Sequence, residues 1–287
     1  MKKYFYSKCP AKINLFLKLT GKRSDGYHEL ESLFAFLDLS DELFVEKSEE
    51  FKLEITGEFA EFIDQKNNLF TKILDYFAAE FSISKNLHIK IIKNIPVGAG
   101  LGGGSSNAAY FIMALNEIFE LNLSKKELQK ISLNFGSDIA FLLENQASIV
   151  KGRGEIIENF PKFEEISALL INPKISVSTK EIFEKFGGNF SAKIETSQLL
   201  KKDVFDLIKN FPNDMEKPAI SSLPLISEIL NCLKKSSAEI AKMSGSGASC
   251  FGVFRSEKEL ELATEFFQKN FPRFFIKKVK IRASVSI

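Results

Sequence analysis

The sequence has no tryptophan, only three cysteines and only two histidines among its 287 residues. The cysteines (Cys9, Cys232 and Cys250) are odd in number and lack the spacing of metal ligands, which argues against a zinc site and against a disulfide framework. No apolar run reaches the roughly 18 residues of a membrane span, and no apolar segment follows the basic start MKKYFYSKCPAK. These absences predict a protein of the reducing cytoplasm, without a signal peptide and without a membrane partner.

The sequence also lacks an excess of charge of either sign. Its 39 Lys and Arg residues against 37 Asp and Glu residues give a formal net charge of +2. A nucleic-acid-binding domain usually carries a concentrated basic stripe. The densest basic stretch, residues 277–282, alternates basic with apolar side chains, which is typical of a half-buried strand with one solvated face. We therefore expect no nucleic-acid partner.

The residues that are present predict a globular α+β protein. Hydrophobic residues make up 45% and charged residues 26% of the chain, and the length allows one large domain or two lobes. Strands and helices are mixed without strict βαβ alternation, with a lobe boundary near 155–165. Strands are expected at 11–19, 42–47, 52–56, 87–92, 168–171, 250–254 and 275–285. Helices are expected at 68–81, 106–119, 124–134, 139–143, 179–186 and 257–270, with a helix-rich stretch at 197–235.

The most informative segment is a glycine-rich run between an expected strand and an expected helix. It holds five glycines in eleven residues: Pro96, Val97, Gly98, Ala99, Gly100, Leu101, Gly102, Gly103, Gly104, Ser105 and Ser106. Glycines permit positive φ and leave no Cβ in the way, so main-chain N–H groups can converge on a polyanion. The start of the following helix adds unpaired N–H groups and the positive end of its dipole. The segment therefore predicts a phosphate site, at which the serine hydroxyls are able to reach a phosphate-bound Mg²⁺.

Other interpretations of this run are weaker. Gly98, Gly100 and Gly103 satisfy G-x-G-x-x-G, but the nearest acidic residues, Glu117 and Glu120, lie on the following helix rather than at the end of a next strand. The P-loop pattern fails because no lysine follows the glycines. A loop without a ligand remains open, although its glycines make ordering the chain entropically costly.

Three separated segments resemble the motifs of the GHMP kinases, which include galactokinase, homoserine kinase and mevalonate kinase. PAKINLFLKL is similar to the first motif, PVGAGLGGGSSNAA to the second and KMSGSGASCFGVF to the third, in the same order and spacing. Within this superfamily, LGGGSSNAA, GKRSDGYHELESLF and the Gly-Arg-Gly at 152–154 resemble the 4-diphosphocytidyl-2-C-methyl-D-erythritol kinases. The galactokinase sugar-binding signature is absent, and the homoserine and mevalonate enzymes have a shorter loop.

The resemblance implies an α+β fold of two lobes. Residues 1–160 would form an ATP-binding lobe like domain 2 of ribosomal protein S5, and residues 161–287 a ferredoxin-like lobe. It also implies ATP as phosphoryl donor, with Mg²⁺ carried by the nucleotide rather than held by the protein. The implied substrate is a cytidine diphosphate-linked methylerythritol, phosphorylated on its 2-hydroxyl group in the non-mevalonate route to isoprenoid precursors.

Two charged residues are the candidate catalytic groups. Asp138 in NFGSDIAFLL lies where the family places its catalytic aspartate, although a plain helix N-cap is the alternative. Lys12 lies in an apolar strand, where a lysine side chain often extends to solvent. The resemblance implies that Asp138 accepts the proton of the acceptor hydroxyl, and that Lys12 keeps Asp138 ionised and offsets charge on the transferred phosphoryl group.

The remaining candidates would bind the acceptor. Asn14 shares a strand face with Lys12, and the resemblance points it at the methylerythritol end. The resemblance also implies that His28 hydrogen-bonds the cytosine edge while Tyr27 and Phe183 stack on the base, with Phe34 and Thr179 as further wall residues. Without it, Phe183 is an ordinary core residue. Gly245 and Ser246 would approach the diphosphate or the ATP phosphates, unless their segment is a simple turn.

Two alternative functions stay open. One is a GHMP-type kinase acting on mevalonate, homoserine or a sugar, and the other is a catalytically silent nucleotide-binding module. The oligomeric state is expected to be a monomer or a weak homodimer.

Overall fold

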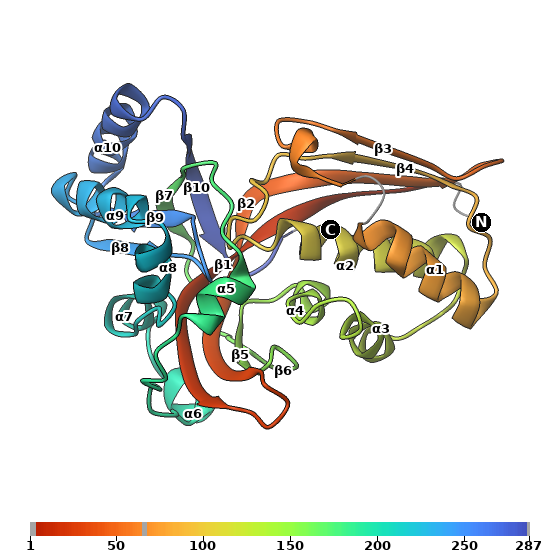
Figure 1. Ribbon diagram of the computed structural model, residues 1–287, viewed down its shortest axis with the longest axis horizontal. Coiled ribbons are helices and arrows are strands. Elements are labelled where there is room, and N and C mark those ends of the chain that lie inside the picture. Colours follow the sequence, from red (N-terminus) through yellow and green to blue (C-terminus); the bar gives the residue numbers. More distant parts are fainter. Residues whose placement is uncertain (1–3, 65–67, 286–287) are drawn as a thin grey trace.

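One sheet runs through both halves of the molecule in this computed structural model, which describes residues 4–64 and 68–285 (Figure 1). Neighbouring strands follow the order β3-β4-β2-β10-β7-β9-β8, while β1 pairs with β2 and the β5–β6 hairpin pairs with β2 through β5. The β3–β4 pair is parallel and the others are antiparallel. The strands are β1 (Tyr4–Lys22), β2 (His28–Lys47), β3 (Lys52–Thr56), β4 (Leu87–Ile92), β5 (Ser148–Gly152), β6 (Ile156–Asn159), β7 (Ile166–Asn172), β8 (Ile240–Met243), β9 (Cys250–Val253) and β10 (Phe275–Arg282).

The helices gather in two groups that define two lobes (Figure 1). The first lobe carries η1 (Ala60–Phe62), α1 (Leu69–Phe81), α2 (Gly103–Ile118), α3 (Lys125–Ser132) and α4 (Ile139–Glu144). The second carries α5 (Thr179–Glu184), α6 (Thr196–Leu199), α7 (Val204–Asn210), α8 (Glu216–Ser222), α9 (Leu225–Lys235) and α10 (Glu257–Asn270). No helix in the described ranges is both long and apolar enough to cross a bilayer.

The two longest strands, β1 and β2, form the backbone of both lobes. They contain 19 and 20 residues and pair along nearly their whole length, with register shifts where the pairing is interrupted. The sequence predicted only residues 11–19 and 42–47 of this pair. In the middle of β1 both faces are buried. Lys12 and Asn14 therefore lie inside the molecule.

The C-terminal strand β10 joins the lobes. It pairs with β7 along seven positions and with β2 at Leu37 and Phe36. Val279 and Ile281 are buried while Lys278 and Arg282 are exposed, which confirms the expected half-buried strand. One core cluster accordingly contains residues of both lobes, such as Ile13 and Phe251.

Most expected elements are present, with differences at their ends. Strands β5, β6 and β8 were not expected. Helix α2 begins at Gly103 rather than at Ser106. Glycine has a low helix propensity, so the sequence suggested a later start. The earlier start places Gly103 and Gly104 in the first turn of the helix.

Candidate active site

The glycine-rich run forms an open cradle of main-chain amides between β4 and α2. Gly98, Gly100 and Gly102 have φ values of 63°, 74° and 65°, a region that favours glycine. Within the described residues, no amide N–H group from Val97 to Ser105 donates a hydrogen bond to the protein. Unpaired amides at the start of a helix are suited to an anion.

Ser106, at the end of this run, is fully buried, and its Oγ has no hydrogen-bond partner in the described part of the chain. Buried hydroxyl groups are normally hydrogen-bonded, so an unpaired one beside a phosphate cradle indicates a ligand. No group of three or more His, Cys, Asp or Glu side chains in the described ranges is arranged to hold a metal ion.

A buried cluster of Asp41, Lys93 and Asn107 lies directly behind the cradle. Asp41 accepts hydrogen bonds from the main-chain N–H groups of Asn94 (2.7 Å) and Ile95 (2.9 Å) and from Asn107 Nδ2 (2.9 Å). Lys93 Nζ contacts the Asp41 carboxylate and lies 2.7 Å from Asn107 Oδ1. The cluster ties β2, the start of the loop and helix α2 together. The sequence analysis missed it, because Asp41 and Lys93 are 52 positions apart in the chain.

The loop also touches strand β1 at Lys12. The Lys12 N–H group donates to Leu101 O over 2.9 Å. A Cβ atom placed on Gly102 would lie 2.6 Å from Lys12 Cγ, so only glycine lets the two segments approach this closely.

Lys12 and Asp138 form an ion pair at the mouth of this cradle. Lys12 Nζ lies 3.3 Å from Asp138 Oδ2 and 2.6 Å from Asn14 Oδ1, and the Lys12 side chain is only 6% exposed. The alternative in which Lys12 extends to solvent is therefore wrong. Asp138 precedes α4, but its side chain makes no capping hydrogen bond, and it is 31% exposed. Phe34 is buried, with its ring 4.9 Å beneath Lys12 Nζ.

The Gly/Ser segment between β8 and β9 packs against both Asn14 and the cradle. The Asn14 N–H group donates to Ser244 Oγ (3.1 Å), which in turn donates to Gly100 O (3.1 Å). The Ser249 N–H group donates to Ala99 O. A Cβ on Gly245 would lie 3.0 Å from Asn14 Oδ1. The third motif of the second lobe thus contacts the first and second motifs.

An aromatic group surrounds His28 at the start of β2. The imidazole lies 5.3 Å from the ring centre of Phe183, 5.9 Å from that of Phe186 and 6.2 Å from that of Phe190. Burial, with a smaller contribution from the nearby Lys22 charge, lowers the pKa of His28. The ring is therefore neutral at pH 7, with one nitrogen able to donate and one able to accept a hydrogen bond.

Tyr27 lies beside this group but makes a different contact. Its exposed ring packs under the Arg153 guanidinium, 4.0 Å away, rather than against Phe183. Arg153 belongs to the turn after β5 that carries the Gly-Arg-Gly at 152–154, and the sequence analysis gave it no role. On the other side of the site, Thr179 Oγ1 lies 2.9 Å from Ser246 Oγ, so α5 and the Gly/Ser segment are in contact.

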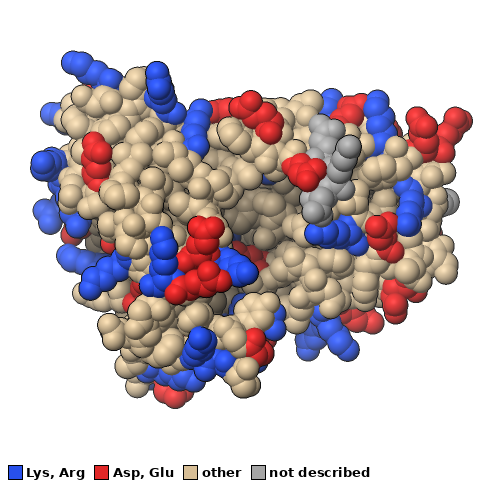
Figure 2. Space-filling model, viewed as in Figure 1, with Lys and Arg blue, Asp and Glu red and all other residues tan. Residues whose placement is uncertain are grey.

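The surface is hollowed between the two lobes (Figure 2). Side chains of both signs gather at its rim, consistent with the nearly neutral chain. In the same view, Figure 1 shows α5 and the start of α2 in this part of the molecule.

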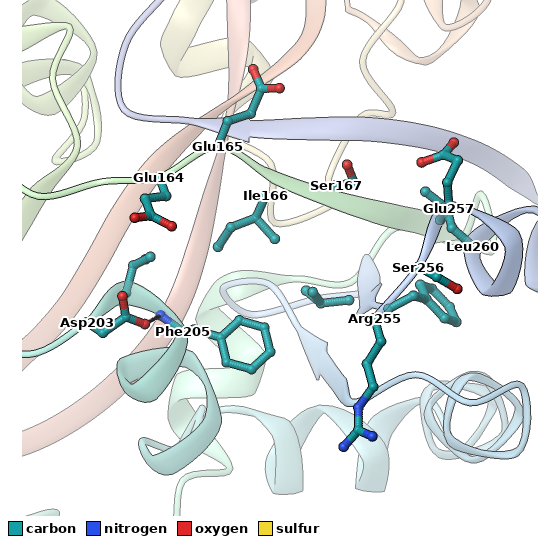
Figure 3. A pocket seen from close by; sticks show the side chains of 13 residues that line it. Glu164, Glu165, Ile166, Ser167, Asp203, Phe205, Arg255, Ser256, Glu257 and Leu260 are labelled. Carbon is teal, nitrogen blue, oxygen red and sulfur yellow. Dashed lines mark hydrogen bonds between the residues drawn. The ribbon is translucent and has the colours of Figure 1, made fainter.

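A separate pocket in the second lobe, of about 310 Å³, contains none of the candidate residues (Figure 3). Three of its four acidic side chains are already engaged: Glu165 pairs with Arg282, Glu257 with Lys278, and Asp203 caps α7. A second pocket of about 450 Å³ lies between α3, α4 and β6. Neither pocket includes the Lys12–Asp138 pair.

Comparison with known proteins decides the family. Residues 68–148 match the GHMP kinases N terminal domain, and residues 196–273 match the GHMP kinases C terminal domain. The 4-diphosphocytidyl-2-C-methyl-D-erythritol kinase of Chelativorans sp. (strain BNC1) is 34% identical over 280 residues, covering 96% of each chain. The chain belongs to this kinase family. The enzyme of Thermoanaerobacter pseudethanolicus is 35% identical, covering 94% of each chain.

Solved structures of GHMP kinases agree with the fold. A crystal structure of 4-(cytidine 5'-diphospho)-2C-methyl-D-erythritol kinase superposes with a TM-score of 0.77 at 26% identity, covering 96% of this chain and 99% of that one. The Leishmania (L. major) mevalonate kinase in complex with R-mevalonate gives a TM-score of 0.70 at 14% identity, covering 100% and 99%, which concerns the fold alone. The two-lobed α+β prediction is therefore confirmed, and the protein is a small-molecule kinase of the GHMP class.

Proposed function

We propose that this protein transfers the γ-phosphoryl group of ATP to the 2-hydroxyl group of 4-diphosphocytidyl-2-C-methyl-D-erythritol, in the non-mevalonate route to isoprenoid precursors. The observation that carries the proposal is the Lys12–Asp138 ion pair, held at 3.3 Å beside a cradle of unpaired amides. An acceptor hydroxyl at Asp138 and a triphosphate in the cradle would then meet at one place.

The cradle supplies the donor site. Its free N–H groups and the start of α2 would hold the β- and γ-phosphates, whose charge they offset. Positive charge and fixed donors around the transferred group are the main protein contribution to phosphoryl transfer.

Asp138 and Lys12 would act on the acceptor. The Asp138 carboxylate takes the proton of the 2-hydroxyl as that oxygen bonds to the γ-phosphorus, and ADP leaves with the electrons of the broken bond. Lys12 Nζ, fixed between Asp138 and Asn14, would orient the carboxylate and offset charge on the transferred group.

The residues fit a Mg²⁺ ion that arrives with ATP. The unpaired Ser106 Oγ is a suitable oxygen ligand for an ion that keeps several of its waters. When bound, Mg²⁺ would supply charge neutralisation at the phosphate oxygens.

The aromatic group around His28 would bind the cytosine base. Phe183 and Tyr27 offer faces for stacking, which typically contributes about 1–3 kcal/mol per base. Neutral His28 would hydrogen-bond the base edge, while Phe34 and Thr179 would complete the wall. Gly245 and Ser246 would approach the diphosphate.

An acceptor panel tests the proposal. Purified protein with Mg-ATP is given the cytidyl acceptor, mevalonate, homoserine or galactose, and ADP release is followed. We expect turnover with the cytidyl acceptor only. Turnover with another alcohol alone would instead establish a different acceptor, and the absence of any turnover with bound ATP would favour a silent nucleotide-binding module.

We further propose that the lobes divide near residue 160, between the end of β6 at Asn159 and the start of β7 at Ile166. The protein would work in the cytoplasm, without a nucleic-acid partner, as a monomer or weak homodimer. Sedimentation over a range of concentrations tests the last point.

A further inference from the structure

The short segment 211–215, which connects α7 to α8, is fixed along the edge of strand β1. The Leu17 N–H group donates to Pro212 O (3.0 Å), and the Asp214 N–H group donates to Leu17 O (2.7 Å). Asp214 Oδ2 also accepts from the Leu19 N–H group over 2.7 Å. These bonds tie the segment to the strand that carries Lys12 and Asn14, and they leave the residue between Pro212 and Asp214 little freedom.

The side chain of that residue, Asn213, contacts the Gly/Ser segment of the third motif. It is only 7% exposed, and its Nδ2 donates to both Met243 O and Gly245 O, each over 2.8 Å. Its Oδ1 accepts from the Met215 N–H group over 3.0 Å. Of the two ends of the asparagine amide only the NH₂ group donates, so contacts with two carbonyl oxygens on one side and an N–H group on the other determine the orientation of the side chain.

Holding the Gly245 carbonyl also determines where the next amide points. In a planar trans peptide the N–H group lies opposite the C=O group, so a Gly245 carbonyl aimed at Asn213 turns the Ser246 N–H group away from Asn213. Ser246 is only 8% exposed, yet its N–H group has no hydrogen-bond partner in the described part of the chain. A largely buried, unpaired donor indicates a ligand on that side.

Contacts of the Ser246 side chain indicate which ligand. Ser246 Oγ lies 2.9 Å from Thr179 Oγ1, at the start of the helix that carries Phe183 beside His28. The Gly245–Ser246 peptide therefore lies between the cradle, where Gly245 packs against Gly100, and the acceptor side, where Ser246 contacts Thr179.

We propose that Asn213 is a positioning residue for the acceptor, an inference that rests on the proposed function. Its amide group holds the Gly245–Ser246 peptide so that the Ser246 N–H group donates to a phosphate oxygen of a cytidine diphosphate moiety. Asn213 itself touches neither substrate.

Asn213→Asp tests this at nearly constant volume, because a carboxylate in place of the NH₂ group faces two carbonyl oxygens and repels them. We expect the Kd of CDP, measured by calorimetry, and the KM of the cytidyl acceptor to rise at least about tenfold, as for a lost hydrogen bond to a charged group. The Kd of cytidine, which has no phosphate, should stay within about twofold, as should the KM of ATP.

Asn210→Asp is the matched control. Asn210 is exposed, and its Nδ2 donates only to Asp206 O within α7, so the same chemical change there leaves the Gly/Ser segment untouched. Its CDP affinity should equal that of the wild type. If Asn213→Asp does not fold, Asn213→Ala removes both donors without adding charge. It should likewise weaken CDP binding and leave cytidine binding nearly unchanged.

Unchanged CDP affinity in a folded Asn213 variant would overturn the proposal, as would an equal loss of CDP and cytidine affinity, which indicates general damage. Measurements on the wild-type protein distinguish failure of the Asn213 proposal from failure of the proposed function. A wild type that binds no CDP and does not phosphorylate the cytidyl acceptor would reject both, whereas a wild type that does both leaves only the Asn213 inference at risk.

Discussion

At the scale of single residues, the central feature is a lysine buried beside a carboxylate that is partly open to solvent. Lys12 is 6% exposed and Asp138 is 31% exposed. A buried charge is expensive unless it is paired and hydrogen-bonded, and Lys12 has both Asp138 and Asn14 as partners. The more accessible carboxylate is the one able to meet an acceptor hydroxyl.

Asp138→Asn should therefore retain ATP binding and lose turnover. The amide cannot accept the hydroxyl proton, and general-base contributions are typically about 10²-fold or more, so kcat should fall by at least that factor. Calorimetry with a non-hydrolysable ATP analogue measures binding, and ADP release measures kcat. Near-normal kcat in this variant would remove Asp138 from its proposed role.

His28 predicts a pH dependence of acceptor binding. Burial holds its pKa below the usual 6.5, so the ring is neutral at pH 7 and gains a proton only at lower pH. Protonation removes the acceptor nitrogen. We expect the KM of the cytidyl acceptor to be flat above about pH 6.5 and to rise below it, because the proton binds only in that range.

The control for this experiment is His28→Asn, which keeps a donor and an acceptor but does not titrate. Its acceptor KM should lack the rise at acid pH. A rise of equal size in both proteins would show that another group is responsible. The same lowered pKa means that the contribution of His28 to folding stability is present above pH 6.5 and is lost as the pH falls.

At the scale of elements, the glycines of the loop permit positive φ angles and also let the loop approach strand β1 closely. Gly102, the N-cap residue of α2, has φ of 65° and leaves room for the Lys12 side chain. The loop is also fixed from behind by Asp41 and from the second lobe by Ser244. A segment with many glycines is thus held in one shape by its neighbours.

Gly102→Ala should lower kcat by about 10²-fold, the effect expected when a catalytic group is displaced by about 1 Å. The new Cβ would lie 2.6 Å from Lys12 Cγ, so the lysine stem must move. Steady-state kinetics and thermal melting measure the two effects. The positive φ adds a destabilisation of about 1–2 kcal/mol.

Gly188→Ala separates these effects, because Gly188 has φ of 78° but nothing lies within 4 Å of its Cβ position. It should show the stability loss without the loss of kcat. Equal kcat in the Gly102 and Gly188 variants would mean that the contact with Lys12 is unimportant.

At the scale of the whole molecule, buried polar contacts connect segments that are far apart in the chain. Asp41 lies on β2, which extends through both lobes, and it binds Lys93 before the loop and Asn107 on α2. Ion pairs this deep are weak sources of stability, but removing one partner leaves a buried charge without compensation.

Lys93→Met should lower the free energy of unfolding by about 3–5 kcal/mol, because the Asp41 charge loses its counter-ion. Urea denaturation gives this value. Lys90→Met, at an exposed position three residues earlier on β4, is the control and should change stability by less than about 1 kcal/mol. If both variants unfold at the same urea concentration, the Asp41 cluster does not hold the loop in place.

The sequence by itself determined the family, the α+β class and the three motifs. These depend on local features, such as glycine spacing, alternation and capping residues, that can be read within a short window of chain. It also named Lys12, Asp138 and Asn14, whose roles stay predictions although the structure brings the three together.

Only the tertiary structure decided which distant residues meet. The Asn213 contact with the third motif, the Asp41 cluster and the Arg153 contact with Tyr27 each join positions separated by tens to more than a hundred residues. No local pattern marks such pairs, because a buried polar residue is defined by partners that the fold supplies. The start of β1 was missed because Tyr4 and Tyr6 are exposed while Ser7 is buried, so polarity there does not follow the two faces of the strand.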